Sequence, residues 1–246
     1  MTLLEACVDT LTSALHAEAG GADRVEMCSD LADAGTTPSH GVLEAALERV
    51  GIPVFPMIRA RGGSFVCDAD DRAVMRADLR HARELGAPGA VVGALTPEGD
   101  IDADFVATLR DDARDMQLTF HRAFDVCRDP HAGLDVLIRL GLDRVLTSGQ
   151  AATAAAGQAA IAQLVRQAGD RIAILAGGGV DEYNVAGLVA ATGVREVHVR
   201  CTSEHRDPPG PRVIHFRKAL PVDDRTRMVT DPGRIAAVKA RLSSNP

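Results

Sequence analysis

Glutamate and cysteine, separated by one residue, occur twice near the start of the chain. Glu5 precedes Cys7 and Glu26 precedes Cys28, each at the end of a short apolar run. Side chains alternate between the two faces of a β-strand, so each cysteine would share a face with its glutamate. Two neighbouring thiolates suit a soft ion such as Cu(I), which makes Cys7 and Cys28 candidate metal ligands. The alternative is that both are small buried hydrophobic side chains.

Two carboxylates and two arginines form a second set of candidates. Glu5 and Glu26 would lie in strand interiors, where a carboxylate needs a charged or hydrogen-bonding partner. Arg59 and Arg61 are one residue apart and precede two glycines, so a ligand can approach the backbone beside them. We expect these arginines either to neutralise the two glutamates or to bind an anionic substrate through paired hydrogen bonds. A purely structural layer of ion pairs is the alternative.

A histidine lies where another apolar run ends. His121 follows Thr119 and Phe120, at the point where a strand would give way to its loop. Because the ordinary pKa of histidine is close to neutrality, His121 is a candidate general acid or base. Asp125, four residues further on, is the candidate to orient it. A hydrogen-bonded histidine at the rim of the fold is the alternative.

The later part of the chain has features of an anion site. Two hydroxyl side chains, bare glycine amides and a histidine occur at the ends of the last predicted strands. Phosphate sites of α/β barrels commonly use these last loops and the helix start that follows. A tight turn would explain the three consecutive glycines equally well. The candidates are Thr147, Ser148, Gly149, Gly177, Gly178, Gly179 and His198.

These candidates are positioned by an alternation of strand-like and helix-like segments. The eight predicted strands are Leu3–Val8, Arg24–Met27, Val54–Arg59, Ala90–Gly93, Gln117–His121, Arg144–Thr147, Arg171–Ala176 and Glu196–Val199. The predicted helices between them are Thr10–Ala19, Pro38–Val50, Asp70–Leu85, Asp102–Asp115, Pro130–Leu140, Ala151–Ala168 and Glu182–Ala191. Thr37 before Pro38 and Asp129 before Pro130 fit an N-cap followed by proline at the first helical position.

Strict alternation of strand and helix predicts an α/β fold with a parallel sheet, either open and doubly wound or closed. Eight units in about 200 residues, with candidate residues at many strand ends, favour a single (β/α)8 TIM barrel. We expect one domain over residues 1–246. After the eighth unit, the proline-rich stretch Thr202–Thr230 predicts a surface excursion, and Arg234–Leu242 a closing helix.

Composition excludes several classes of protein. The 27 Lys and Arg residues against 34 Asp and Glu residues give a net charge of −7, and the chain has only seven aromatic residues, so nucleic-acid binding is disfavoured. No apolar run reaches the roughly 18 residues of a membrane span, and the first residues do not resemble a secretory signal. The five widely spaced cysteines are typical of reduced thiols, which predicts a cytoplasmic protein.

The motifs together resemble the CutC family, from Leu3 to about His198. The shared motifs are Glu-x-Cys twice, Gly20-Gly21-Ala22-Asp23-Arg24, Thr37-Pro38-Ser39, Ile58-Arg59-x-Arg61-Gly62-Gly63, Thr119 to Asp125, Arg144-x-Leu146-Thr147-Ser148-Gly149, and the late glycines with Asn184. The resemblance implies a TIM barrel and a cytosolic protein that handles Cu(I), with Cys7 and Cys28 at positions implicated in copper binding. The chain departs from the family pattern at Ala34, Ala60, Cys67 and Arg200.

Two functions follow from these observations. The first is copper homeostasis, with cytosolic Cu(I) binding or trafficking through Cys7 and Cys28. The second is an enzyme of unknown substrate, acting on a small anionic metabolite, phosphorylated or not, at the barrel mouth with the charged residues described above. The polar set is richer than two-coordinate Cu(I) requires, and this favours the enzyme. We also expect a homo-oligomer, either a dimer or a tetramer.

Overall fold

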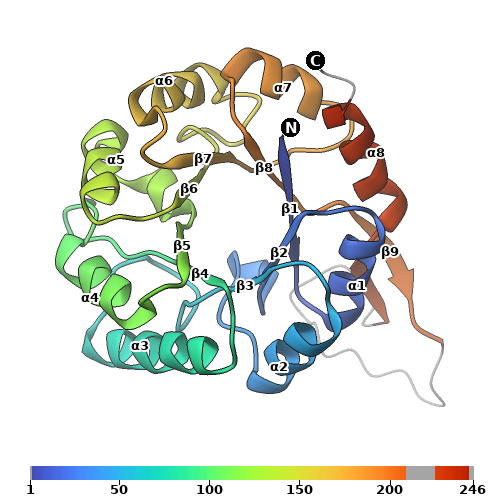
Figure 1. Ribbon diagram of the computed structural model, residues 1–246, viewed down its shortest axis with the longest axis horizontal. Helices are drawn as coiled ribbons and strands as arrows, with labels where there is room; N and C mark the ends of the chain where they lie inside the picture. Colours follow the sequence, from blue (N-terminus) through green and yellow to red (C-terminus); the bar gives the residue numbers. More distant parts are fainter. Residues whose placement is uncertain (1, 209–224, 244–246) are drawn as a thin grey trace.

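The computed structural model describes residues 2–208 and 225–243, which form a ring of helices around a parallel sheet (Figure 1). The central strands are β1 (Leu3–Val8), β2 (Arg24–Met27), β3 (Val54–Pro56), β4 (Gly89–Val92), β5 (Gln117–Phe120), β6 (Arg144–Thr147), β7 (Ala173–Ala176) and β8 (Glu196–Val199). The helices are α1 (Leu11–Ala19), α2 (His40–Arg49), α3 (Ala69–Glu84), α4 (Ala103–Ala113), α5 (Pro130–Arg139), α6 (Gln158–Ala168), α7 (Val185–Thr192) and α8 (Pro232–Ser243), with 3₁₀ turns η1 (Leu31–Asp33) and η2 (Arg122–Val126).

The sheet closes on itself. Its hydrogen-bonded order is β3-β2-β1-β8-β7-β6-β5-β4, and every pair in it is parallel. A parallel bridge between Met57 and Val91, with Ile58 N–H donating to the Val91 carbonyl at 2.8 Å, joins the two outer strands. The predicted (β/α)8 TIM barrel is confirmed, and the open doubly wound sheet is wrong.

Alternating side chains divide each strand between two environments. The residues that face outward are apolar and fully buried beneath the helices, as Leu4, Ala6 and Val25 show. The residues that face inward in β1 and β2 include Glu5, Cys7, Arg24 and Glu26, and Cys28 follows directly after β2. The helix ring therefore supplies the larger apolar core, which leaves the barrel interior free to hold charged groups.

The interior of the barrel holds a chain of ion pairs. The Arg24 guanidinium joins Glu5 on β1 to Glu196 on β8, at 2.5 and 2.6 Å. Arg144 on β6 reaches the same Glu196 carboxylate at 3.1 Å. The ring of Phe55 lies beneath both guanidinium groups, 5.1 and 5.4 Å from their central carbons. Each charge in this chain of ion pairs thus has a partner of the opposite sign, which is the condition for a stable charged interior.

Several predicted helix starts differ from the structure by two or more residues; α7, for example, begins at Val185 rather than Glu182. Ser39, rather than Thr37, caps α2, because the Thr37 hydroxyl is bonded to the backbone N–H and carbonyl of Arg59. Helix α6 begins at Gln158 rather than Ala151, because the preceding segment is held as a turn by the bond from Ala154 N–H to the Gly178 carbonyl. The Asp129 cap of α5 is confirmed.

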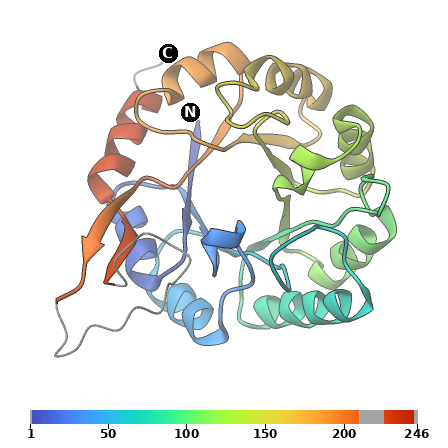
Figure 2. The same cartoon turned by 180° about the vertical axis from the view of Figure 1, so that it is seen from behind.

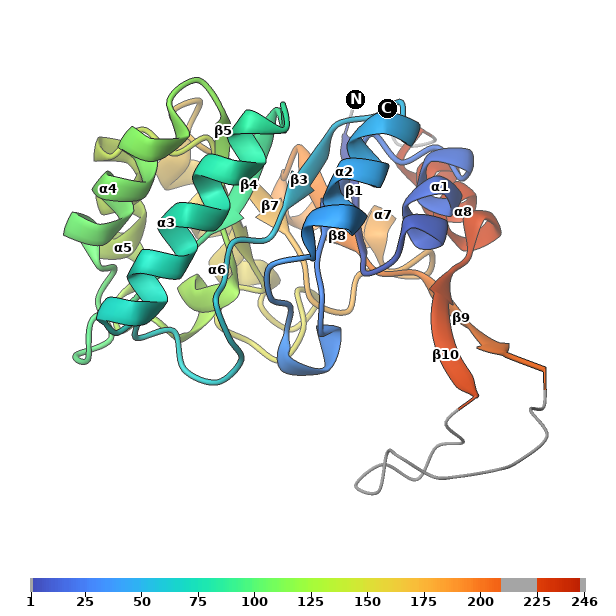
Figure 3. The same cartoon turned by 90° about the horizontal axis from the view of Figure 1, so that it is seen from below.

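The segment after β8 is more regular than predicted. Strands β9 (Thr202–Arg206) and β10 (Thr226–Thr230) pair as an antiparallel hairpin that projects from the barrel (Figure 3). The remaining part of the expected excursion, 209–224, lies outside the described residues. Helix α8 lies between α7 and α1, as Figure 1 shows, so the predicted closing helix is confirmed. None of the helices described has the length and apolar content needed to cross a membrane.

Candidate functional site

Cysteine, glutamate and histidine side chains meet at the carboxyl ends of β1, β2 and β8, the end of the barrel where η1 lies (Figure 2). The potential ligand atoms of Cys7, Glu26 and His198 all lie within 4.8 Å of one another. Cys28 completes the group, since its Sγ donates to Glu26 Oε2 at 3.6 Å. We call these four residues the mouth cluster. All are buried except His198, whose side chain is 12% exposed.

Glu5, deeper in the barrel, supports the mouth cluster through a hydrogen bond with His198. Its Oε1 accepts a hydrogen bond from His198 Nδ1 at 2.7 Å, while its Oε2 is paired with Arg24. Burial alone would raise the pKa of Glu5, but the Arg24 charge and the bond from His198 outweigh burial and lower it to about 2. The imidazole is thereby oriented with Nε2 toward Glu26, 3.8 Å from Oε2.

The two thiols of the mouth cluster differ in acidity. Hydrogen bonding from Cys28 holds the pKa of Cys7 well below the ordinary thiol value, and His198 acts in the same direction against the effect of burial. The same bond to Cys7, together with burial, raises the pKa of Cys28 well above the ordinary value. Cys7 is therefore the more acidic of the two thiols and the one that more readily becomes a thiolate.

Glu26 and His198 are shifted in the same direction. Burial, reinforced by the Cys7 charge, raises the pKa of Glu26 well above its ordinary value, which favours the protonated carboxyl. The pKa of His198 is also raised well above its ordinary value, because the pull of Glu26, Cys7 and Glu5 exceeds the effect of burial. Glu26 Oε1 is buried without a hydrogen-bond partner among the described residues. The mouth cluster thus retains one unused oxygen ligand.

The two sequence-predicted arginines do not neutralise Glu5 or Glu26, and that expectation is wrong. Arg24 pairs with Glu5 instead. Arg59 donates to the backbone carbonyls of the loop after β2, and Arg61 pairs with Asp71 at 2.7 Å on the outside of the barrel mouth. Both arginines leave the sheet beyond the end of β3, so strand alternation no longer directs them inward.

His121 is buried at the end of β5, apart from the mouth cluster. The backbone N–H of Ala123 donates to its Nδ1 at 3.1 Å. The expectation that Asp125 orients His121 is therefore wrong. Burial, with the nearby Arg59 charge, lowers the pKa of His121 to about 3, which keeps the ring neutral.

The candidate anion loop after β6 already contains a carboxylate. Asp125 accepts hydrogen bonds from the Thr147 hydroxyl at 2.5 Å, the Ser148 backbone N–H at 2.9 Å and the Gln150 backbone N–H at 3.2 Å. Gly149 N–H is bonded to the Thr147 hydroxyl. The donors that the sequence offers to a ligand at this loop are thus largely used within the protein.

The glycines after β7 have a packing role. Gly177 N–H donates to the Thr147 carbonyl at 3.0 Å, and a Cβ at this residue would lie 3.0 Å from the Cβ of His198. The missing side chain thus lets His198 pack over β7 with its ring toward Glu5. His198, predicted to belong to the anion site, is placed by the structure in the mouth cluster. Anion binding at Gly178 and Gly179 stays a prediction.

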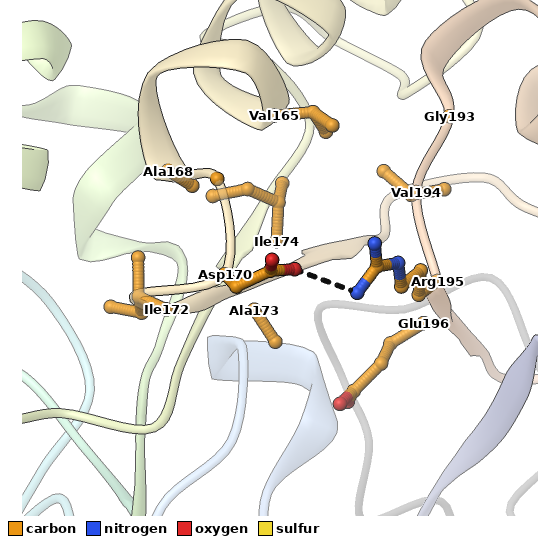
Figure 4. A pocket seen from close by; sticks show the side chains of 11 residues that line it. Val165, Ala168, Asp170, Ile172, Ala173, Ile174, Gly193, Val194, Arg195 and Glu196 are labelled. Atoms are coloured by element: carbon orange, nitrogen blue, oxygen red, sulfur yellow. Dashed lines mark hydrogen bonds and ion pairs between the residues drawn. The ribbon is translucent and has the colours of Figure 1, made fainter.

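A pocket of about 550 Å³ opens between α6 and β8, at the end of the barrel opposite the mouth cluster (Figure 4). Apolar side chains such as Val165 and Ile172 line it, and the Asp170–Arg195 pair spans it at 2.9 Å. Glu196, the inner end of the ion-pair chain, also reaches it. Sequence reasoning did not find this pocket, because residues from three elements meet there without a shared motif.

The part of the site that sequence reasoning missed is the supporting charge network. Arg24 and Glu196 each lie two residues before a mouth residue, Glu26 and His198 respectively. The alternation of side chains that linked each glutamate to its cysteine therefore also places these two inside the barrel. That signal was available in the sequence.

Comparison with known proteins agrees with this architecture. Residues 2–203 match the sequence profile of the CutC family. The chain belongs to the CutC family. The human copper homeostasis protein cutC homolog is 46% identical over 201 residues, which is 82% of this chain and 74% of the human protein. The mouse homolog is 43% identical over 238 residues, covering 93% of this chain and 87% of its own length.

Solved structures give the same result. The CutC structure from Streptococcus agalactiae superposes with a TM-score of 0.77 at 36% identity, covering 80% of this chain and 98% of that one. Phosphoribosylanthranilate isomerase from Pyrococcus furiosus covers 99% of both chains with a TM-score of 0.57 at 14% identity, which shows a shared fold alone. The resemblance that the motifs predicted is confirmed.

Proposed function

We propose that this CutC-family protein binds Cu(I) at the mouth cluster, with Cys7 and Cys28 as thiolate ligands. The observation that carries the proposal is the convergence of Cys7, Glu26 and His198 within 4.8 Å, with Cys28 bonded to Glu26. Soft thiolates select Cu(I) over hard cations, and an imidazole is compatible with copper. The relatives that carry the name copper homeostasis protein support the same metal.

The charge distribution suits a monovalent soft ion. The hydrogen bond from Cys28 and the nearby His198 lower the pKa of Cys7, which favours an ionised sulfur ligand for the metal. Cys28 must lose its proton to become the second ligand, and metal binding is therefore expected to release protons. The protonated Glu26 carboxyl, which its raised pKa favours, adds no charge to the mouth cluster. Its Oε1 is available as an additional oxygen ligand.

Trafficking is part of the proposal. A carrier must pass its ion to another protein, and the mouth cluster lies at an end of the barrel rather than at its centre, with Cys7 7% exposed. Thiol ligands bind Cu(I) only while they stay reduced, so the proposal places the protein in the cytoplasm. The five free cysteines of the chain are consistent with that compartment.

The test is a Cu(I) titration against a competing chelator without oxygen. Cys7→Ser and Cys28→Ser are each expected to lower the affinity for Cu(I) at least tenfold. Cys127→Ser is the matched control, because Cys127 is as buried as Cys7 but lies in the loop after η2. Equal affinity of the wild type and both mouth-cluster variants would contradict the proposal.

An enzyme at the same mouth is a second candidate. The observation that favours it is the opposite pKa shift of two buried carboxyl groups, Glu5 downward and Glu26 upward. A pair of carboxyl groups held in different protonation states is typical of acid–base sites. Incubation with a metabolite extract, followed by mass spectrometry, tests it: a change in one metabolite that Glu26→Gln abolishes supports an enzyme, and no change contradicts it.

A further inference from the structure

Two hydrogen-bond donors are buried without partners beneath the loop that follows β3. Arg59 Nε and His121 Nε2 have no acceptor among residues 2–208 and 225–243. The two residues are 6% and 3% exposed. A buried donor without an acceptor costs roughly 1–3 kcal/mol, and native proteins seldom leave one unpaired. Two of them in one place indicate a missing acceptor.

The tautomer of His121 identifies its free nitrogen as a donor. Because Nδ1 accepts the hydrogen bond from Ala123 N–H, the neutral ring must carry its proton on Nε2. His121 and Arg59 therefore both offer an N–H, and neither can satisfy the other. A group that bridges them must accept two hydrogen bonds.

The charge at this place is positive and uncompensated by an ion pair. The terminal nitrogens of Arg59 donate to the carbonyls of Asp33, Gly35 and Gly63, at 2.6, 2.9 and 2.8 Å. The Asp33 carboxylate acts on the guanidinium only from a distance beyond ion pairing, within the part of the chain that the structure covers. A buried cation whose contacts are all neutral favours an anionic ligand.

The side chains of Arg59 and His121 both pack against the Phe65 ring. The Phe65 ring lies 4.8 Å from the Arg59 guanidinium carbon and 5.0 Å from the His121 ring centre. A cavity of about 10 Å³ is lined by Arg59, Phe65 and Gly93, and Gly93 in turn borders the His121 ring. Asp71 also lines this cavity, but its carboxylate is paired with Arg61. That volume is close to what one water-sized atom needs. A Cβ at Gly93 would lie 2.3 Å from the His121 ring, so only glycine leaves the ring this position.

We propose that Arg59 and His121 form a binding site for one small anion, either a halide or one oxygen of a carboxylate. The Arg59 Nε–H and the His121 Nε2–H donate to it, and Phe65 covers it. The site is separate from the mouth cluster. It does not depend on Cu(I) binding, so its test can fail or succeed independently of that proposal.

Thermal unfolding at constant ionic strength tests the site, with chloride or formate replacing gluconate, which is too large to enter. At ten times the dissociation constant, the wild type is expected to gain about 3–5 °C in Tm, saturably. His121→Phe keeps an aromatic ring but removes the donor, and is expected to lose the gain. Arg128→Gln removes an exposed arginine paired with Asp100 and is expected to keep it. A gain with chloride alone identifies a halide site, and a gain with formate alone a carboxylate site.

Diffraction from bromide-soaked wild-type crystals keeps the test decisive if His121→Phe does not fold. An anomalous peak within hydrogen-bond distance of both Arg59 Nε and His121 Nε2 is expected. The proposal is overturned if neither chloride nor formate raises Tm saturably, if His121→Phe retains the gain, or if soaked crystals hold neither bromide nor formate at this position.

Discussion

Replacement of Arg24 by methionine tests the claim that the barrel interior is held by paired charges. The side chain of Arg24 is 4% exposed, and it neutralises Glu5, which is fully buried, and Glu196. Methionine keeps most of the volume but leaves Glu5 with His198 alone. Breaking a buried ion pair from one side costs about 3–5 kcal/mol, because an uncompensated charge remains.

Urea denaturation at pH 7 measures this loss as a change in the free energy of unfolding. Arg195→Met is the matched control, because the Arg195–Asp170 pair is 82% and 85% exposed and is expected to contribute less than about 1 kcal/mol. Adding Glu5→Gln to Arg24→Met is expected to recover part of the loss, since the unpaired charge disappears. An Arg24→Met loss no larger than the Arg195→Met loss would show that the buried Glu5 does not depend on Arg24 for its stability.

Three further predictions concern stability. Ala34 has a φ of +65°, a conformation that glycine adopts without strain. Ala34→Gly is therefore expected to raise the free energy of unfolding by about 0.5–1 kcal/mol in urea denaturation. A lower free energy of unfolding in the variant would contradict this prediction. Gly93→Ala is expected to displace the His121 ring and lower Tm, and an unchanged Tm would show that the ring can move freely. The lowered pKa of Glu5 contributes about 3 kcal/mol to the free energy of unfolding. This contribution is complete above the unfolded-state pKa of 4.5 and is lost as the pH falls towards 2. The free energies of unfolding of the wild type and Glu5→Gln should therefore differ less at pH 3 than at pH 7.

Strand and helix alternation predicts the α/β class, and the number of units, with candidate residues at many strand ends, selects the closed barrel. Leu3–Val8, Arg24–Met27, Arg144–Thr147 and Glu196–Val199 are strands with the predicted limits, because each is a short run bounded by turn residues. The period of two also placed each glutamate and its cysteine on one face. Closure through Met57 and Val91 could not be derived from local pattern, since it joins segments distant in the sequence.

The site was predicted less completely than the fold. Partner choice depends on which side chains reach each other across the barrel, and register decides that. Glu5 lies opposite Arg24 on one side and His198 on the other, so these two, rather than Arg59 and Arg61, became its partners. Arg59 instead donates hydrogen bonds to backbone carbonyls of the loop after β2. Beyond the end of a strand the backbone no longer alternates regularly, so the sequence pattern does not predict which way a loop side chain points.

Cys7 and Cys28 are the proposed ligands of Cu(I) at the mouth cluster. X-ray absorption at the copper edge of the Cu(I)-loaded protein tests this proposal most directly, because sulfur ligands are distinguished from nitrogen and oxygen by their scattering. We predict sulfur in the first coordination shell of the wild type and of Cys127→Ser, and its loss in Cys7→Ser/Cys28→Ser. Unchanged sulfur scattering in the double variant, or a first shell of nitrogen and oxygen alone in the wild type, would contradict the account.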